Sequence, residues 1–325
     1  MELREGFELV TIMSNFSIRH YNPQTDLSPL SRMLTEIESI DRDGEDTSEE
    51  YLRRALEWPN YRPAQDVWVA EKDGALVGYG VALEQPSQRC TLYVVVHPSQ
   101  RRNGLGNQLL DLVLARAREF ESTTILVYAN QHNSASNSFL KYHEFVSVGL
   151  SGAMKAPTTL EMIPSFEFPD GFALKKYSEV NDSLILLSAL NDCYLGMWGH
   201  QHNDEPMEEE IQSPRFLKYY DAENILLLFD SKNAVSGICS VKPDGKRDEN
   251  GNPADLLDGP GVIREYRDEG FQRQLVLAGL QHLRKRGMHA VILEFYGDDE
   301  KALDIYCDLG FKMVNQYIAY YKELE

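Results

Sequence analysis

The segment HPSQRRNGLGNQLL, residues 97–110, carries the strongest functional signal in this sequence. It follows the apolar run TLYVVV and precedes a segment with helical apolar spacing, which predicts a turn from a strand into a helix. Its two glycines, Gly104 and Gly106, allow backbone N–H groups to approach a ligand closely. The N-terminus of the following helix adds partial positive charge, and Arg101 and Arg102 add formal charge. The segment therefore predicts a binding site for a diphosphate.

Length and charge limit the classes of protein that this chain can represent. Its 325 residues predict two domains, and its net charge of −19 would repel a nucleic-acid backbone. No apolar stretch has the length of a membrane span, and the acidic start of the chain is not typical of a signal peptide. We therefore expect a cytoplasmic protein, a monomer or homodimer, that has neither nucleic acid nor membrane as its partner.

The four cysteines are scattered and form no C-x-x-C pair, which is typical of a reduced compartment. We expect all of them to be small core residues. Four thiols without a pairing pattern predict no disulfide framework.

The second half of the sequence repeats the first. Gly104 and Phe145 are 41 residues apart, and Gly270 and Phe311 have the same separation. Each glycine precedes a segment of helical periodicity, and each helix is followed by a short apolar strand. Two copies of one α/β unit explain this spacing.

The repeat also sets the expected domain boundaries. We expect a first domain over residues 1–155, a proline-rich linker over 156–171 and a second domain over 172–325. In each half, an aspartate (Asp26, Asp182) stands where a strand leads into a helix and predicts a helix start. The second half also contains KPDGKRDENGNPAD, residues 242–255, whose composition predicts a polar turn-rich loop.

These motifs resemble the GCN5-related N-acetyltransferase (GNAT) superfamily. The segment V-H-P-S-Q-R-R-N-G-L-G-N is similar to that family's pyrophosphate loop, and N-S-A-S-N-S-F-L-K-Y-H-E-F and D-E-K-A-L-D-I-Y-C-D-L-G-F resemble its second acetyl-CoA motif. The resemblance covers nearly the whole chain, twice. It implies the α/β class, with two tandem GNAT domains, each a splayed, mainly antiparallel sheet with helices on both faces.

The resemblance also implies how acetyl-CoA would bind in the first half. Loop residues would hold the pyrophosphate, three strand residues would offer backbone groups to the pantetheine arm, and an asparagine would contact that arm from the other side. The residues that match these family positions are Arg101, Arg102, Asn103, Gly104, Leu105, Gly106 and Asn107 in the loop, Val94, Val95 and Val96 in the strand, and Asn133.

In this family the acceptor amine attacks the thioester directly, and a tyrosine protonates the leaving thiolate. The matching tyrosine in the second half is Tyr306, which we expect to face a cleft, whereas the first half has Leu140 there. Asp255 and Asp258 stand near the position of an acidic base, in what reads as a loop, and Asp258 is the candidate base. The implied reaction is acetyl transfer to the amine of a small molecule.

The second half departs from the loop pattern, because Asp268 and Glu269 bring negative charge and Gln272 replaces the second glycine. We therefore expect acetyl-CoA in the first half. The segment N-D-C-Y-L-G-M-W-G-H resembles one in mycothiol-synthase-like tandem GNAT proteins, and this resemblance implies that Trp198 and His200 line the acceptor site. We expect no metal. The alternative to an enzyme is a CoA-binding pseudoenzyme or sensor.

Overall fold

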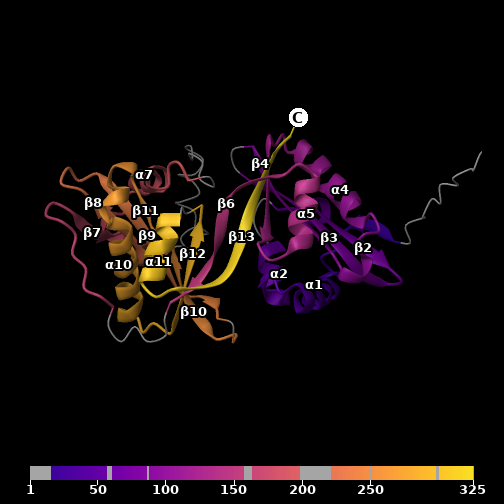
Figure 1. Cartoon of the computed structure of the whole chain (residues 1–325), viewed down its shortest axis with the longest axis horizontal. Helices are drawn as coiled ribbons and strands as arrows, with labels where there is room; N and C mark the ends of the chain where they lie inside the picture. Colours follow the sequence, from indigo (N-terminus) through magenta and orange to yellow (C-terminus); the bar gives the residue numbers. More distant parts are fainter. Residues whose placement is uncertain are drawn as a thin grey trace, which may run out of the picture. The chain divides into compact units, whose positions relative to one another are not determined.

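The computed structural model describes residues 16–56, 61–85, 88–156, 163–197, 221–248, 250–297 and 300–324 (Figure 1). These residues form two compact units. The first unit comprises Met1–Tyr128, Tyr142–Phe145 and Tyr321–Glu325, and the second comprises Ala129–Lys141 and Val146–Tyr320. Neither unit is one continuous piece of sequence.

The first unit is built on a sheet with the strand order β1-β2-β3-β4-β5. Neighbouring strands are antiparallel except for β4 and β5, which are parallel. Its strands are β1 (Ser17–His20), β2 (Val67–Lys72), β3 (Ala75–Gln85), β4 (Arg89–Val96) and β5 (Thr124–Asn130). The helices of this part of the chain are α1 (Leu27–Asp41), α2 (Glu49–Leu56), α3 (Pro63–Asp66), α4 (Leu105–Glu119) and α5 (Ser134–Tyr142), with the 3-10 turn η1 (Pro98–Gln100).

Helices cover both faces of this first sheet. A Cβ at Gly78 would lie 3.0 Å from Leu109 Cδ1, so α4 lies directly on one face of β3. On the other face, Val81 of β3 belongs to the same buried cluster as Leu30 of α1 and Leu52 of α2. Alternation along β3 separates the two sets of contacts, as strand geometry requires.

The second unit repeats this pattern, with the strand order β6-β12-β10-β9-β8-β7 and β13 on the other side of β6. Again one pair of neighbours in this order, β10 and β12, is parallel. The strands are β6 (Val146–Lys155), β7 (Ala173–Lys176), β8 (Ile225–Phe229), β9 (Val235–Arg247), β10 (Pro253–Asp258), β11 (Gly261–Val262), β12 (Ala290–Tyr296) and β13 (Lys312–Glu323). The helices are α6 (Tyr177–Val180), α7 (Ser183–Cys193), α10 (Phe271–Lys285) and α11 (Glu300–Asp308), with the 3-10 turns η2 (Ala222–Asn224) and η3 (Arg264–Glu269).

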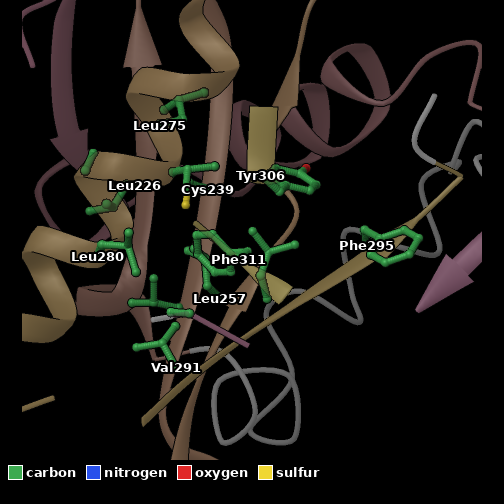
Figure 2. Close-up of a cluster of buried hydrophobic side chains, with 14 of the residues drawn as sticks. Leu226, Cys239, Leu257, Leu275, Leu280, Val291, Phe295, Tyr306 and Phe311 are labelled. Atoms are coloured by element: carbon green, nitrogen blue, oxygen red, sulfur yellow. The ribbon is translucent and has the colours of Figure 1, made fainter. Parts of the chain in front are cut away.

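The main core of the second unit lies between its sheet and the two helices α10 and α11 (Figure 2). Leu257 of β10, Leu275 of α10 and Tyr306 of α11 are fully buried there. A smaller cluster forms on the opposite face, where Leu186 of α7 packs with Ile238 of β9. Both units are therefore mixed sheets with helices on both faces, as the sequence predicts.

The last strand of the first half and the last few residues of the second half each belong to the unit of the other half. β6 ends the first half of the sequence, yet it pairs antiparallel with β12 of the second unit, where Gly152 stands opposite Phe295. Conversely, the final residues of the chain belong to the first unit, in which Leu324 N donates to Thr123 O at 2.9 Å. The compact units therefore differ from the sequence ranges 1–155 and 172–325, because strand pairing and not chain order decides which unit holds each final strand.

The predicted loop over residues 242–255 is wrong. β9 continues to Arg247 and β10 starts at Pro253, so the segment forms a hairpin. Its tight turn is closed by Asp248, whose N–H donates to Asn252 O at 2.8 Å. Asp255 and Asp258 consequently lie on a strand and not in a loop. Composition favoured a loop here because turn residues occupy both the turn and an irregularity within β9.

The expectations for the two helix-start aspartates and for the four cysteines are each confirmed only in part. Asp182 caps α7 through bonds from Leu184 N and Ile185 N, whereas Asp26 occupies the N-cap position of α1 but pairs with Arg19. Three cysteines are buried, but Cys307 is exposed, so it is not the core residue that we expected. Among the described residues, no helix has the length and apolar character to cross a membrane.

Gly152→Ala should destabilise the second unit by about 2 kcal/mol. A Cβ at this position would overlap the backbone oxygen of Asn315 on β13 and lie 2.9 Å from the Phe295 ring. Chemical denaturation would measure the loss. Val148→Ala, a change at a 37% exposed position of the same strand, is the control. Equal stabilities of the two variants would contradict this close packing of β6.

Candidate functional site

The opening in the first sheet lies where β4 leaves β5. β4 pairs with β3 along its whole length, from Arg89 to Val96. Its register with β5 covers only Arg89, Cys90 and Thr91. Beyond Thr91 the two parallel strands diverge, which leaves one side of β4 without the partner that a closed sheet would provide.

Two of the three predicted valines direct their backbone groups into this opening. His97 N donates to Val77 O of β3 at 2.9 Å, so the backbone of residue 97 faces β3. Because N–H and C=O groups alternate sides along a strand, Val94 and Val96 face the opposite side and Val95 faces β3. The expected backbone contacts can therefore come from Val94 and Val96 but not from Val95.

The predicted loop follows directly and ends at an uncapped helix. Arg102 and Gly104 have φ values of 64° and 82°, so the backbone enters the left-handed region at two residues before α4 starts. The first helical bond runs from Gln108 N to Gly104 O, and no side chain caps the helix. The N–H groups of Leu105 and Gly106 therefore have no partner within the helix and are suited to an anion.

The structure corrects the role of Arg101. Its Nε donates to Val96 O at 3.0 Å, and its Nη1 donates to Asp41 Oδ1 at 2.9 Å. The guanidinium therefore joins the end of β4 to the end of α1 and does not point to a diphosphate. Arg102, which is exposed, is the loop arginine that can contact an anion.

The second unit contains the same arginine bridge. Arg267 Nε donates to Val262 O at 2.9 Å, and Arg267 Nη2 donates to Leu195 O at 2.7 Å, beyond the end of α7. In both units the arginine thus bonds the carbonyl five residues before it and fixes the turn from the strand.

Two of the three predicted asparagines have structural partners. Asn133 Oδ1 accepts from Ser136 N at 3.1 Å and so caps α5. Asn107 Oδ1 lies 3.1 Å from His143 Nε2. Burial lowers the pKa of His143, with Lys322 acting in the same direction and Asp111 opposing it. Because the ring is then neutral near pH 7, its Nε2–H can donate to Asn107 and hold this side chain beside the loop.

The second loop has a similar backbone but different side chains. Gly270 has a φ of 83° and precedes α10, which also has no side-chain cap. Asp268 pairs with Lys301 at 2.9 Å, and both side chains are exposed. This pairing offsets part of the negative charge that the sequence places at the loop. Glu269 and Gln272 remain as differences, and Gln272 stands where the first loop has Gly106.

Tyr306 does not face a cleft, so this expectation is wrong. Its exposed fraction is 0%, and it packs in the main core of the second unit (Figure 2). Its hydroxyl accepts a hydrogen bond from Gln272 Nε2 at 3.2 Å. The glutamine that alters the loop thus bonds the tyrosine of the second motif. Leu140, at the matching position of the first half, is also buried.

Asp258 has the electrostatic environment of a proton acceptor. It is half-buried at the end of β10, opposite Glu294 of the parallel strand β12. Burial raises the pKa of Asp258 to about 7, and the negative charge of Glu294 acts in the same direction. Lys242 and Lys246 oppose this shift. A carboxyl group with a pKa near 7 can both accept and release a proton at neutral pH.

Two candidate residues, Trp198 and His200, lie outside the described residues. Within the described ranges, no group of three or more histidine, cysteine, aspartate or glutamate side chains could hold a metal ion.

Comparison with known proteins assigns the family. The model of the GNAT acetyltransferase family matches residues 31–145 and 185–311, which together make up more than half of the chain. The chain belongs to the GNAT family. Each half matches the model separately, so this is a tandem GNAT protein.

The GNAT relatives include mycothiol acetyltransferases. That of Paenarthrobacter aurescens (strain TC1) is 24% identical over 251 residues, 77% of this chain and 75% of the relative. That of Saccharomonospora viridis is 26% identical over 234 residues, 70% of this chain and 72% of the relative. With the family match, these relatives identify the chain as an N-acetyltransferase, distantly similar to the mycothiol enzymes.

Solved structures share the fold. A GCN5-related N-acetyltransferase from Sphaerobacter thermophilus has a TM-score of 0.76 at 20% identity, over 95% of this chain and 96% of that chain. A tandem GNAT protein from the clavulanic acid biosynthesis pathway has a TM-score of 0.63 at 16% identity, over 95% and 98%. At these identities the likeness concerns the tandem GNAT fold alone.

The sequence did not predict Asp41 and Glu294, which act on the candidate residues Arg101 and Asp258 from other parts of the chain. Asp41, which pairs with Arg101, is 60 positions away and carries no local signal. Glu294 does carry one, because it is an acidic residue inside the apolar strand AVILEFY. A charge in a buried strand is rare and indicates a partner or a function.

Arg101→Gln should lower the unfolding free energy of the first GNAT unit by about 2 kcal/mol, because it removes charge-assisted bonds to Asp41 and Val96. Arg102→Gln, a change at the exposed neighbour, should leave stability unchanged. Urea titrations of both variants would measure the difference. A stable Arg101→Gln variant would contradict the bridging role.

Asp258→Asn should stabilise the second GNAT unit at pH 8 by about 1 kcal/mol or more. The folded state resists ionisation of Asp258, so the charged carboxylate costs stability as pH rises from about 4 to 7. The asparagine carries no charge, and its advantage should be complete above pH 7 and fade toward pH 4. Denaturation across this range would test this, with the exposed Asp170→Asn as control. A gain that does not depend on pH would contradict the raised pKa.

Proposed function

We propose that this N-acetyltransferase takes its acetyl group from acetyl-CoA and transfers it by direct attack to the amine of a small molecule. The observation that carries the proposal is the divergence of β4 from β5, followed by the glycine loop and the uncapped start of α4. The diverging strand offers backbone groups to the pantetheine arm, and the helix N-terminus offers N–H groups to the pyrophosphate. The acceptor class is supported by relatives named mycothiol acetyltransferases.

The first unit supplies the tighter acetyl-CoA site in this proposal. A Cβ at Gly104 or at Gly270 would meet no atom within 4 Å, so both loops have open space beside them and the difference lies in their side chains. Gly106 adds no side chain, and Arg102 supplies a cation. In the second unit, Gln272 extends from the same helix position as Gly106 and contacts Tyr306. This side chain reduces the access of a ligand to the backbone N–H groups of α10.

The second unit supplies the proton acceptor. Asp258 removes a proton from the acceptor's ammonium group, and the amine nitrogen then forms a bond to the acetyl carbonyl carbon. The bond from that carbon to sulfur breaks, the nitrogen releases its second proton to water, and the CoA thiolate takes a proton from water, since Tyr306 is buried. A carboxyl group with a pKa of about 7 suits this task near neutral pH. Turnover therefore takes place in the second unit, on a second and more weakly bound acetyl-CoA at the start of α10.

Glutamate substitutions at the two loop glycines test this division. Gly104→Glu should weaken the tight acetyl-CoA site at least about tenfold, because the carboxylate repels the pyrophosphate, whereas Gly270→Glu should leave that site intact. Isothermal titration with acetyl-CoA measures both. Gly74→Glu is a matched control, since Gly74 has a similar φ of 79° and open space in the turn between β2 and β3. Loss of the tight site only in Gly270→Glu would reverse the assignment.

Thiol release from acetyl-CoA with a panel of small amines measures turnover. Gly270→Glu and Asp258→Asn should both reduce it, the latter about 100-fold or more. Full turnover in Asp258→Asn would remove this residue from the mechanism. Tight acetyl-CoA binding without thiol release for any amine would favour the alternative of a cofactor sensor.

A further inference from the structure

An irregularity in β9 brings two lysines together on one face of the second sheet. Lys242 stands opposite Leu256 of β10, and Lys246 stands opposite Ala254. Four steps along β9 thus match two steps along β10, and the extra residues form a bulge. A bulge permits a proline inside a strand and redirects the neighbouring side chains. The first half has no matching insertion, so this feature is specific to the second unit.

The lysines share this face with two carboxylates. Leu257 of β10 contacts α10 on the other face, where a Cβ at Gly279 would meet it. Asp258, the next residue, therefore faces away from α10. Its register partner Glu294 lies on the same face, and Glu294 Oε1 is 2.8 Å from Lys246 Nζ. Three adjacent strands thus bring an ion pair next to the candidate base.

We propose that Glu294 and Lys246 are positioning residues that hold Asp258 ready to take the proton of the acceptor amine. The proposal rests on the function proposed above, and it adds that the bulge in β9 is a working part of the site. Lys246 pairs with Glu294 and holds its carboxylate at the position opposite Asp258, and the negative charge there directs the proton to Asp258.

The direction in which each neighbouring group shifts the pKa of Asp258 agrees with this arrangement. Two carboxyl groups at partner positions of neighbouring strands disfavour a second negative charge. Burial makes the largest contribution to the raised pKa of Asp258, Glu294 adds to it, and Lys242 and Lys246 limit it. Without the lysines the pKa of Asp258 would be higher, and without Glu294 it would be lower.

Three further polar groups, Tyr194, Lys155 and Tyr296, lie near this face. Tyr194, beyond the end of α7, donates its hydroxyl to Gly259 O at 3.0 Å, directly after Asp258. Lys155 of β6 stands opposite Ile292, and Tyr296 follows Glu294 on the same face of β12. Of the described groups, those that act on the charge of Asp258 are Glu294, Lys242 and Lys246.

The first unit lacks this arrangement at the matching positions. Arg89 stands opposite the first residue of β5, and Ala254 stands opposite the first residue of β12. Four residues further along each strand are Tyr93 and Asp258. Likewise, the fifth residue is Tyr128 in β5 and Glu294 in β12. A pair of tyrosines in one unit thus corresponds to a pair of carboxylates in the other, as expected if only the second unit needs a base.

A direct titration tests the inference without requiring turnover. Protein labelled with carboxyl-13C aspartate would be titrated by NMR, and Asp258→Asn would identify the signal of Asp258. Glu294→Gln should lower the titration midpoint of Asp258 by about half a pH unit or more, and Lys246→Met should raise it. Glu294→Asp should restore most of the midpoint, and Lys232→Met, at an exposed lysine, should leave it unchanged. Midpoints that do not move in these opposite directions would overturn the inference.

The acid limb of the pH dependence of kcat/KM, measured by thiol release, then separates the two proposals. It should move to lower pH in Glu294→Gln and to higher pH in Lys246→Met, in parallel with the NMR midpoints. Midpoints that move while the acid limb stays fixed would show that Asp258 is not the base, which would overturn the proposed mechanism and its positioning pair. Because the Lys246 side chain is 46% exposed, its replacement should fold even if Glu294→Gln does not.

Discussion

The hydrogen bond from an arginine to the backbone carbonyl five residues before it fixes the geometry on which both units depend. Arg101 bonds Val96, and Arg267 bonds Val262, so each turn is tied to its strand by the same bond and is followed by a glycine at the start of a long helix. The guanidinium also bonds the end of the unit's first long helix, through Asp41 of α1 in one case and Cys193 O of α7 in the other. A planar donor with several N–H groups can join three segments in this way, which lysine cannot do.

From this shared frame the two units diverge in how their central strands separate. In the first unit, pairing between β4 and β5 stops at Thr91, and β4 continues to the loop paired with β3 alone. In the second, β10 stays paired with β12 as far as Asp258, and Gly259 N still donates to Glu294 O at 2.6 Å. Between Gly259 and the start of β11 at Gly261 lies a single residue, Pro260. The first unit thus retains an open side on its strand, while the second places a carboxyl group at the point of separation.

The sequence predicts elements whose signals are local and misses those that depend on distant partners. The helix expected after Gly104 runs over Leu105–Glu119, because apolar periodicity reports directly on the face that packs against a sheet. The pairing of β6 with β12 has no such signal, since a strand's own pattern does not indicate which edge it joins. Arg101 matched the family loop by position, yet its partner Asp41 determines what it does. Tyr306 matched the motif as well, but burial depends on the whole core around it.

The position of the chain's last residues in the first unit has a consequence for synthesis on the ribosome. Chains grow at about 5–20 residues per second, and an N-terminal domain commonly folds while the rest is still being made. Here the first unit includes Tyr321–Glu325, so it cannot be completed until these residues have been translated. For roughly ten seconds or more, the edge of β5 therefore has no β13 beside it. An exposed edge of this kind can pair with another nascent chain, which makes the first half the part that a chaperone would have to protect.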